Sequence, residues 1–411
     1  MTFYHRLPLN ANVKYVNKHT ALDLILFAPE GLSRVELARQ IGLTRAAMTQ
    51  IVNDLLASGT IHEIESSNSK SGRPPIILEI NPQGGHIVGI DIGATHVNLV
   101  VTDFSGRVLD EVEIPFNVKE PPIQCLDQVD RLFRETLAKM NLKLDDIEAI
   151  GVGVPGPVDT KAGMVIAPPI MPGWDRFPIR ETLEKRWGCP IALANDAELG
   201  ALGEWAYGAA RGEKNIAYIK VGTGIGAGLL LDGQIYHGIS GAAGEIGHLT
   251  MIENGPICNC GNAGCLETLA GGMAIARQAQ EAVRKGQRTM LSEITPIEAI
   301  TTRDVSAIAR RGDRVAQQII VQAGRYLGIA IAGMVNLFNP TMIVFGGGVA
   351  QIGDLFLQPI RDEVQKRSLP AAVRTLRIQT AVLRRRSSSM GAVVLALSMA
   401  LHKLAEAKER R

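Results

Sequence analysis

One pattern of strands and glycine turns occurs twice in this chain of 411 residues. Residues 86–109 read HIVGIDIGATHVNLVVTDFSGRVL, which predicts a buried strand, a glycine turn, a second strand, a polar turn and a third strand. Residues 215–236, NIAYIKVGTGIGAGLLLDGQIY, follow the same plan. Because helical patterns accompany these strands, the duplication predicts an α/β protein built from two equivalent halves.

The glycine-rich turns are candidate phosphate-binding loops. Backbone N–H groups in such a turn can hold phosphate oxygens where no side chain larger than alanine keeps them away. A third glycine run, in TMIVFGGGVA, lies between a predicted strand and a helix, and the carboxylate of Asp91 can hold Mg²⁺ directly or through water. Glycine turns between strands are more often only turns, but three in one duplicated frame favour a nucleotide site. The candidate nucleotide-binding residues are Asp91, Gly93, Thr95, Gly222, Thr223, Gly224, Gly346 and Gly347.

A pair of polar residues stands between the two halves. The predicted strand 190–194 brings Asn195 and Asp196 to its carboxyl end, where a helix begins that runs to about Tyr207. A carboxylate in this place can take a proton from an alcohol as a general base. The alternative is that Asp196 is a first-turn acid stabilised by the helix dipole.

Three of the five cysteines lie close together in the segment CNCGNAGC. Cys258, Cys260 and Cys265 have a histidine, His248, ten residues before the first of them. Three thiolates and one imidazole suit Zn²⁺ in a closed tetrahedral site, so these four residues are candidate metal ligands. The alternative is that they are reduced structural cysteines beside a turn.

The first eighty residues predict short helices followed by a hairpin. Ser33 and Thr44 are in place to cap two helices that are joined by a turn through Gly42, which is helix-turn-helix spacing. Helical periodicity predicts that one face of the second helix is apolar and faces the core, whereas the opposite face is polar. The polar face can enter a major groove. The inward residues are Met48, Ile51, Val52 and Leu55, and the outer ones are Arg45, Ala46, Thr49, Gln50 and Asn53.

Two further strands after Gly59 predict a wing whose loop carries two basic residues able to contact phosphates or a minor groove. The candidate DNA-binding residues are Thr44, Arg45, Thr49, Gln50, Asn53, Lys70 and Arg73. Residues 1–82 contain eight Lys and Arg against seven Asp and Glu, so we expect weak binding by one copy and a dimer on two half-sites. A small helical interaction domain is the alternative.

Charge and hydropathy exclude some classes of partner. The whole chain has 43 Lys and Arg against 41 Asp and Glu, so no global field would hold nucleic acid. Apolar runs such as LGIAIAGMVNLF are shorter than the roughly 20 residues that span a bilayer, which favours a cytoplasmic protein without a membrane partner. We interpret residues 313–340 as a buried core helix, and LRRRSSS at 383–389 as a basic surface turn rather than an anion-binding loop.

Taken together, these segments resemble the ROK family, which groups repressors and sugar kinases on the actin-like ATPase fold. DIGATH looks like the first phosphate motif and GTGIGAG like the second. GVGVPGPVD is similar to the strand and loop before the sugar cleft, and EIGH with CNCGNAGCLE to the sugar and zinc signature. The resemblance covers nearly the whole chain and includes the N-terminal winged helix of the regulators.

The resemblance implies an architecture and a set of roles. Residues 1–82 would form a winged helix-turn-helix domain, and residues 83–411 a duplicated actin-like, sugar kinase-like domain of two lobes with a zinc loop at 248–267, assembled as a homodimer or homotetramer. The zinc would be structural, with the Cys258, Cys260, Cys265 and His248 ligands. Asp196 would be the catalytic base if the chain were a kinase. The implied sugar contacts are Asn195, Asp196, Glu245, His248 and Glu267.

The chain departs from the kinases of this family in the first phosphate motif. It has Gly93-Ala94-Thr95-His96 where the kinases usually carry Gly-Gly-Thr-Lys. The methyl group of Ala94 narrows the space for a phosphate, and the missing lysine removes a cation, so both changes argue against binding of ATP. The resemblance therefore implies a sugar-responsive repressor of carbohydrate uptake or catabolism genes. It would bind a double-stranded DNA operator and a monosaccharide or sugar phosphate, as do repressors that respond to xylose, glucose or N-acetylglucosamine. The alternatives are an ATP-dependent hexose kinase that uses Mg²⁺ and ATP, and a regulator whose signal is a protein partner.

Overall fold

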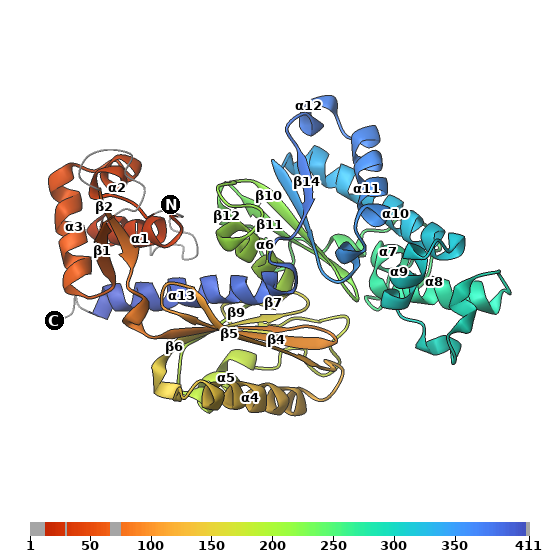
Figure 1. Cartoon of the computed structure of the whole chain (residues 1–411), viewed down its shortest axis with the longest axis horizontal. Helices are drawn as coiled ribbons and strands as arrows, with labels where there is room; N and C mark the ends of the chain where they lie inside the picture. Colours follow the sequence, from red (N-terminus) through yellow and green to blue (C-terminus); the bar gives the residue numbers. More distant parts are fainter. Residues whose placement is uncertain (1–12, 29–30, 66–74, 408–411) are drawn as a thin grey trace.

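The computed structural model describes residues 13–28, 31–65 and 75–407. An N-terminal segment, described residues 13–80, lies at one end, followed by two lobes that each contain a five-stranded sheet (Figure 1). One long helix, α13, extends from between the lobes to the N-terminal segment (Figure 1). The two sheets confirm the two equivalent halves predicted from the duplicated pattern.

The N-terminal segment contains three helices and a hairpin. Ser33 caps α2 in a capping box with Glu36, and the side chain of Thr44 accepts a hydrogen bond from Ala47 N at the start of α3. Both predicted caps are therefore confirmed. The strands of the hairpin pair antiparallel, with Ile61 opposite Ile80. The elements are α1 Val13–Leu26, α2 Arg34–Ile41, α3 Arg45–Ala57, β1 Ile61–Glu65 and β2 Ile76–Ile80.

The first lobe has the strand order β5-β4-β3-β6-β9. The three strands of the first repeated unit pair antiparallel, and β6 and β9 extend the sheet in parallel. Helices α4 and α5 cover one face of this sheet and α13 lies on the other (Figure 1). The elements are β3 His86–Ile92, β4 His96–Asp103, β5 Val108–Pro115, α4 Pro122–Lys139, β6 Ile147–Val154, β7 Val158–Asp159, β8 Met164–Val165, α5 Ile179–Trp187 and β9 Ile191–Asn195.

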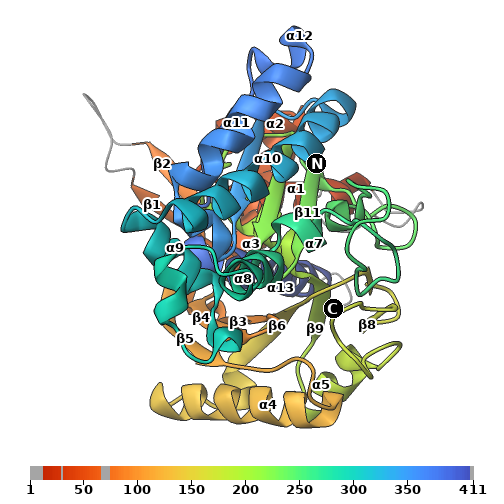
Figure 2. The same cartoon turned by 90° about the vertical axis from the view of Figure 1, so that its right-hand side faces the viewer.

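The second lobe repeats this topology with the strand order β12-β11-β10-β13-β14. Helix α6 packs against β10 and β11, whereas α8 to α11 lie at the end of the molecule away from the N-terminal segment (Figures 1 and 2). The elements are α6 Asp196–Tyr207, β10 Ile216–Val221, β11 Ile225–Leu231, β12 Gln234–Ile235, α7 Glu267–Ala270, α8 Gly272–Arg284, α9 Thr302–Arg310, α10 Arg314–Phe338, β13 Met342–Gly346, α11 Asp354–Arg367, α12 Pro370–Val373, β14 Arg377–Thr380 and α13 Ser387–Ala407.

Helix α13 packs unusually close to its neighbours because glycine faces it on several sides. A Cβ added at Gly151 of β6 would overlap the carbonyl oxygen of Ala392, and one at Gly203 of α6 would overlap that of Ser387. Toward its C-terminal end the helix shares a buried core with the N-terminal segment, in which Leu397 and Leu401 pack with residues of α1 and α3. Helix α13 thus contacts all three parts of the molecule.

Two helices of the described chain, α10 and α13, are long and apolar enough to cross a membrane by length and composition alone. In α10, 61% of the most apolar window is buried within the protein, and in the window that covers α13 the share is 78%. Their hydrophobicity is accounted for by the cores they fill, as predicted for the segment 313–340.

The expectation for LRRRSSS is wrong in its second half. Arg385 and Arg386 do lie in a surface turn, where they pair with Glu113 and Glu111 of β5. Ser387, Ser388 and Ser389 are instead 1%, 2% and 0% exposed, because they begin α13 between the lobes. Their hydroxyls bond to Glu204, to the Asp196 carbonyl and to Asn98, partners that are far away in the sequence.

Candidate functional site

A cavity of about 110 Å³ lies between the lobes and collects most of the residues predicted to act there. It is formed by the turns after β3 and β10, the end of β9 and the loop around η3 (Ile246–His248). The predicted residues that line it are Gly93, Thr95, Asn195, Asp196, Gly222, Thr223, Gly224, Glu245, His248 and Glu267. These residues are far apart in the sequence, and the fold of the two lobes brings them together.

A larger hollow of about 730 Å³ lies elsewhere, on the surface formed by α8 and α10. It is open and lined mostly by amide and charged side chains such as Gln278, Lys285 and Arg325. We assign the functional site to the smaller cavity, because the half-buried carboxyl groups of Asp196, Glu245 and Glu267 converge there and charges withdrawn from water are retained only where they are paired or used.

Asn195 and Asp196 occupy the junction of β9 and α6, as predicted. The side-chain oxygen of Asn195 caps α6 by accepting hydrogen bonds from Ala197 N at 2.8 Å and Glu198 N at 3.1 Å. Its amide nitrogen donates to Gly156 O at 2.9 Å. Asn195 therefore has a structural role that the sequence did not indicate, and the carboxylate of Asp196 beside it faces the cavity.

Lys220 is the functional residue that sequence reasoning missed. Its ammonium group donates hydrogen bonds to Asp91 Oδ2 at 3.2 Å and to Asp196 Oδ2 at 2.9 Å. Burial lowers the pKa of Lys220, but the carboxylates of Asp196 and Asp91 outweigh this effect and raise it, so the lysine is charged. Burial raises the pKa of Asp91, and Lys220 opposes that shift. The feature of the sequence that could have indicated Lys220 is a single charged residue in the otherwise apolar strand IAYIKV.

Two further carboxyl groups face the same cavity. Burial raises the pKa of Glu245 to about 7, and the nearby carboxylates of Asp196, Glu267 and Glu198 add to the shift. Glu267 Oε2 accepts a hydrogen bond from Ile225 N at 3.2 Å, which fixes it beside the second glycine turn. Hydroxyl groups of a ligand can donate to such carboxylates, so the cavity has the polar lining that a carbohydrate requires.

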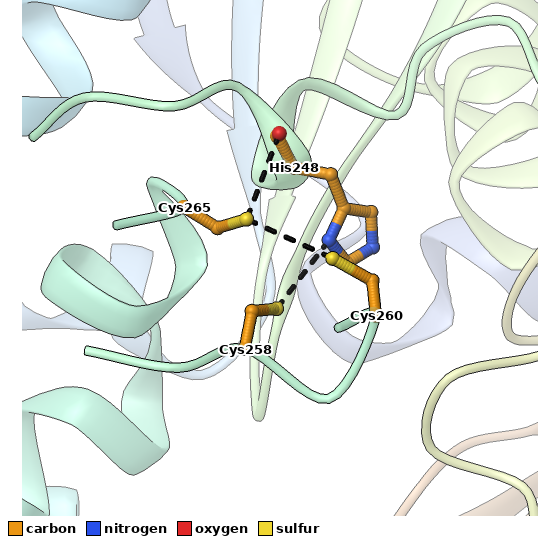
Figure 3. A group of neighbouring side chains, drawn as sticks. All are labelled: His248, Cys258, Cys260 and Cys265. Atoms are coloured by element: carbon orange, nitrogen blue, oxygen red, sulfur yellow. Dashed lines mark hydrogen bonds between the residues drawn. The ribbon is translucent and has the colours of Figure 1, made fainter. Parts of the chain in front are cut away.

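The three cysteines and His248 form one cluster next to this cavity (Figure 3). Their ligand atoms all lie within 4.8 Å of one another, with Cys258 Sγ 3.6 Å from His248 Nδ1 and Cys260 Sγ 3.7 Å from Cys265 Sγ. Tetrahedral ligands bound to Zn²⁺ at about 2.0 to 2.3 Å are separated by roughly 3.3 to 3.8 Å, so the donor set and these two separations fit this ion.

The cluster is joined to the cavity through His248 and Glu267. The Nδ1 atom of His248 faces the sulfur atoms, whereas its Nε2 atom lies 3.7 Å from Glu245 Oε2. Cys258 Sγ donates to Glu267 Oε1 at 3.6 Å. A metal held by the cluster would therefore fix the position of two residues that line the cavity.

The remaining predicted residues lie outside the cavity. Gly346 and Gly347 do not line it in the described part of the chain: Gly346 pairs with Lys220 of β10 in the sheet, and a Cβ on Gly347 would overlap the carbonyl oxygen of Val221. On α3 and its cap, Thr44, Arg45, Thr49, Gln50 and Asn53 are all exposed, and Asn53 Oδ1 accepts from Arg34 Nη1 at 2.9 Å. Lys70 and Arg73 lie outside the described residues.

Comparison with known proteins identifies the family. The ROK family profile matches residues 87–399, which is most of the chain. The chain belongs to the ROK family. A putative xylose repressor of Caldicellulosiruptor sp. (strain Rt8B.4) is 32% identical over 389 residues, which cover 95% of this chain and 97% of that protein. This ROK protein is also 36% identical to the glucokinase of Halalkalibacterium halodurans over 285 residues, covering 69% of this chain and 86% of the kinase.

The similar solved structures also include both transcriptional regulators and sugar kinases. The crystal structure of a ROK family transcriptional regulator, described as a homolog of the Escherichia coli Mlc protein, superposes with a TM-score of 0.79 at 29% identity and covers 96% of this chain and 98% of that one. A ROK glucokinase from Streptomyces griseus in complex with glucose and AMPPNP gives a TM-score of 0.67 at 29% identity, covering 76% of this chain and 99% of the kinase. Similarity to the kinases thus leaves about a quarter of the chain without a counterpart.

Proposed function

We propose that this ROK family protein is a sugar-responsive transcriptional repressor of carbohydrate uptake or catabolism genes. The observation that carries the proposal is the extent of the similarity. Xylose repressors match 86% to 95% of the chain and a ROK family transcriptional regulator matches 96%, whereas a glucokinase of this family is matched over nearly its whole length but covers 76% of the chain. In this proposal residues 1–82 are a DNA-binding domain, residues 83–411 bind a monosaccharide or sugar phosphate, and the protein works in the cytoplasm as a homodimer or homotetramer.

The proposed DNA-binding domain is a winged helix-turn-helix. Helix α3 would enter the major groove with its exposed face, the hairpin β1–β2 would be the wing, and Lys70 and Arg73 would contact the DNA backbone. The opposite face of α3 supports this orientation, because Met48, Leu55 and their neighbours are buried in the core shared with α13. The outer face of α3 is therefore exposed while the other face is held in the core.

Replacing Arg45 by alanine is expected to weaken operator binding by roughly 10- to 100-fold, because a bidentate arginine–guanine contact contributes about 1–3 kcal/mol. Fluorescence anisotropy with a DNA fragment selected by the wild-type protein would measure the loss. The matched control is Arg325→Ala on α10, an exposed arginine outside the N-terminal segment, which should bind DNA like the wild type. Equal affinity of both variants would contradict the proposed interface.

The proposed coupling between sugar and DNA runs through α13. At its first turn, Ser388 Oγ donates to the Asp196 carbonyl at 2.8 Å, beside the cavity. Near its other end, His402 Nε2 lies 3.3 Å from Asp23 Oδ1 of α1. A ligand that favours one relative position of the two lobes would shift this helix against the N-terminal segment, provided that it binds the two positions with different affinities.

The proposed sugar contacts are Asn195, Asp196, Glu245, His248 and Glu267. Asp196→Asn is expected to lower sugar affinity by roughly 10- to 100-fold, because a hydrogen bond to a charged group contributes about 1.5–3 kcal/mol. Calorimetric titration with D-xylose, D-glucose and N-acetyl-D-glucosamine would measure this, alongside release of bound operator DNA. The control is Asp145→Asn, an exposed carboxylate on the far side of the first lobe. A response to sugar that survives Asp196→Asn would refute this assignment.

A hexose kinase with an attached DNA-binding domain is the second candidate, favoured by the similarity to glucokinases. It would use Mg²⁺ and ATP at Asp91 and the glycine turns, with Asp196 as the base that accepts the proton of the sugar hydroxyl. An assay coupled to ADP release decides between the two, since turnover that Asp196→Asn abolishes would favour the kinase. A partner protein that docks on the two lobes is a third source of signal, which a pull-down with the full chain would detect.

We also propose that the cluster of Cys258, Cys260, Cys265 and His248 binds a structural Zn²⁺. The donor set and the spacing of the ligand atoms support this ion. Bound there, the metal would hold the loop 248–267 in shape and keep His248 and Glu267 at the edge of the sugar cavity.

A further inference from the structure

Lys220 lies at the point where the two lobes meet. It is carried by β10 of the second lobe, two residues before the glycine turn GTGIG. Its side chain, 17% exposed, reaches across the interface to Asp91, which is on β3 of the first lobe. It also contacts Asp196 at the start of α6 and, at 3.3 Å, the hydroxyl oxygen of Ser388 on α13. One ammonium group thus connects β10 with β3, α6 and α13.

The position of the ammonium group conflicts with a metal ion. Mg²⁺ prefers six oxygen ligands at about 2.0–2.1 Å, and the oxygens available for it here are those of Asp91 and Asp196. The Nζ atom already lies 3.2 Å from the first carboxylate and 2.9 Å from the second, which is the volume that a bridging cation would enter. A divalent cation placed beside it would be repelled by the charge of the lysine. The residues present therefore do not fit Mg²⁺ between these carboxylates.

The lysine satisfies the same electrostatic need that a metal would satisfy. Asp91 is 1% exposed, and a buried carboxylate requires a compensating charge. The ammonium group provides part of it from within the chain through Asp91 Oδ2, while Asp91 Oδ1 is buried without a hydrogen-bond partner among the described residues. The lysine bonds to Asp196 through Oδ2, which leaves Asp196 Oδ1 to accept a hydrogen bond from a sugar hydroxyl.

We propose that the Lys220 ammonium group is a built-in replacement for a divalent cation between Asp91 and Asp196, so that the cavity binds its sugar independently of Mg²⁺ and nucleotide and transfers no phosphoryl group. This inference rests on the proposed sugar-binding role of the cavity. Phosphoryl transfer needs a metal bound to the phosphates to neutralise the charge of the transition state, and a fixed lysine paired to both carboxylates leaves no place for it there.

The first test uses the full-length, zinc-loaded wild-type protein, with Asp91→Asn and Asp196→Asn as comparison variants. We expect its affinity for D-xylose or D-glucose to change by less than about twofold when Mg²⁺ and AMPPNP are added, and we expect no ADP release with either sugar. Electron paramagnetic resonance with Mn²⁺ should show no binding that depends on Asp91. Mn²⁺ binding that Asp91→Asn removes, or ADP release that Asp196→Asn removes, would overturn the proposal.

The second test removes the lysine. Lys220→Ala should gain a Mn²⁺ site that the double variant Lys220→Ala/Asp91→Asn lacks, whereas the exposed control Lys285→Ala should behave like the wild type. A folded Lys220→Ala protein that gains no Mn²⁺ would overturn the proposal as well. If that variant does not fold, Lys220→Met tests the same gain with more of the apolar side chain retained, and the wild-type measurements still decide. The repressor function is judged separately by sugar-induced release of operator DNA, so the two failures are distinguishable.

Discussion

Replacing Gly151 by valine is expected to prevent the protein from folding. Gly151 lies in the middle of β6, and even a single Cβ there would overlap the carbonyl oxygen of Ala392 on α13. A backbone carbonyl cannot rotate away as a side chain can, and the strand is held on both sides by β3 and β9. Overpacking costs about 1–3 kcal/mol where side chains can move, so we expect about 5 kcal/mol or more here. That is comparable to the whole stability of many domains, roughly 5–15 kcal/mol.

Circular dichroism and thermal denaturation of the purified variant would measure this effect. The control is Gly333→Ala in α10, where an added Cβ has no neighbour within 4 Å and should stabilise the helix by about 0.5–1 kcal/mol. A Gly151→Val protein that unfolds cooperatively within a few degrees of the wild type would show that α13 is not held as closely as the structure indicates.

Removing the metal from the cysteine cluster is expected to abolish the response to sugar. Without an ion, only weak thiol contacts such as that between Cys260 and Cys265 hold the sulfur atoms together, and the loop that positions His248 and Glu267 loses its main anchor. Structural zinc contributes about 10–16 kcal/mol of apparent binding free energy in zinc-finger peptides, so the loop is expected to lose its order entirely. We expect Cys260→Ala to lower sugar affinity by about 100-fold or more, which corresponds to roughly 2.7 kcal/mol.

Elemental analysis should find one zinc ion per wild-type chain and none in Cys260→Ala, and calorimetry should show the loss of sugar binding. The control is Cys125→Ala, a buried cysteine of α4 outside the cluster, which should keep its zinc. Wild-type affinity for sugar in a zinc-free Cys260→Ala protein would show that the ion is not needed to shape the cavity.

The parts of this protein that the sequence predicted correctly depend on local interactions. Ser33 and Thr44 cap helices by bonding to backbone groups three residues away, so the short segment contains the whole interaction. The buried and exposed faces of α3 follow from helical periodicity in the same way. The duplicated strand and glycine turns predicted the two lobes, because each repeated unit pairs with itself as an antiparallel sheet.

What the sequence could not determine depends on contacts between residues that are distant along the chain. Lys220 and Asp91 are 129 residues apart, and Ser389 and Asn98 are 291 apart, so no local pattern links them. For the same reason the sequence did not show that Asn195, predicted as a sugar contact, also caps α6, or that Gly347, predicted at a nucleotide loop, packs against Val221. The sequence by itself determined the two lobes, the helix caps, the polar face of α3 and the grouping of Cys258, Cys260, Cys265 and His248, because each rests on a pattern within a short segment. Only the tertiary structure decided that α13 joins the three parts of the molecule and that a lysine stands between the two cleft carboxylates, because packing across the lobes sets both.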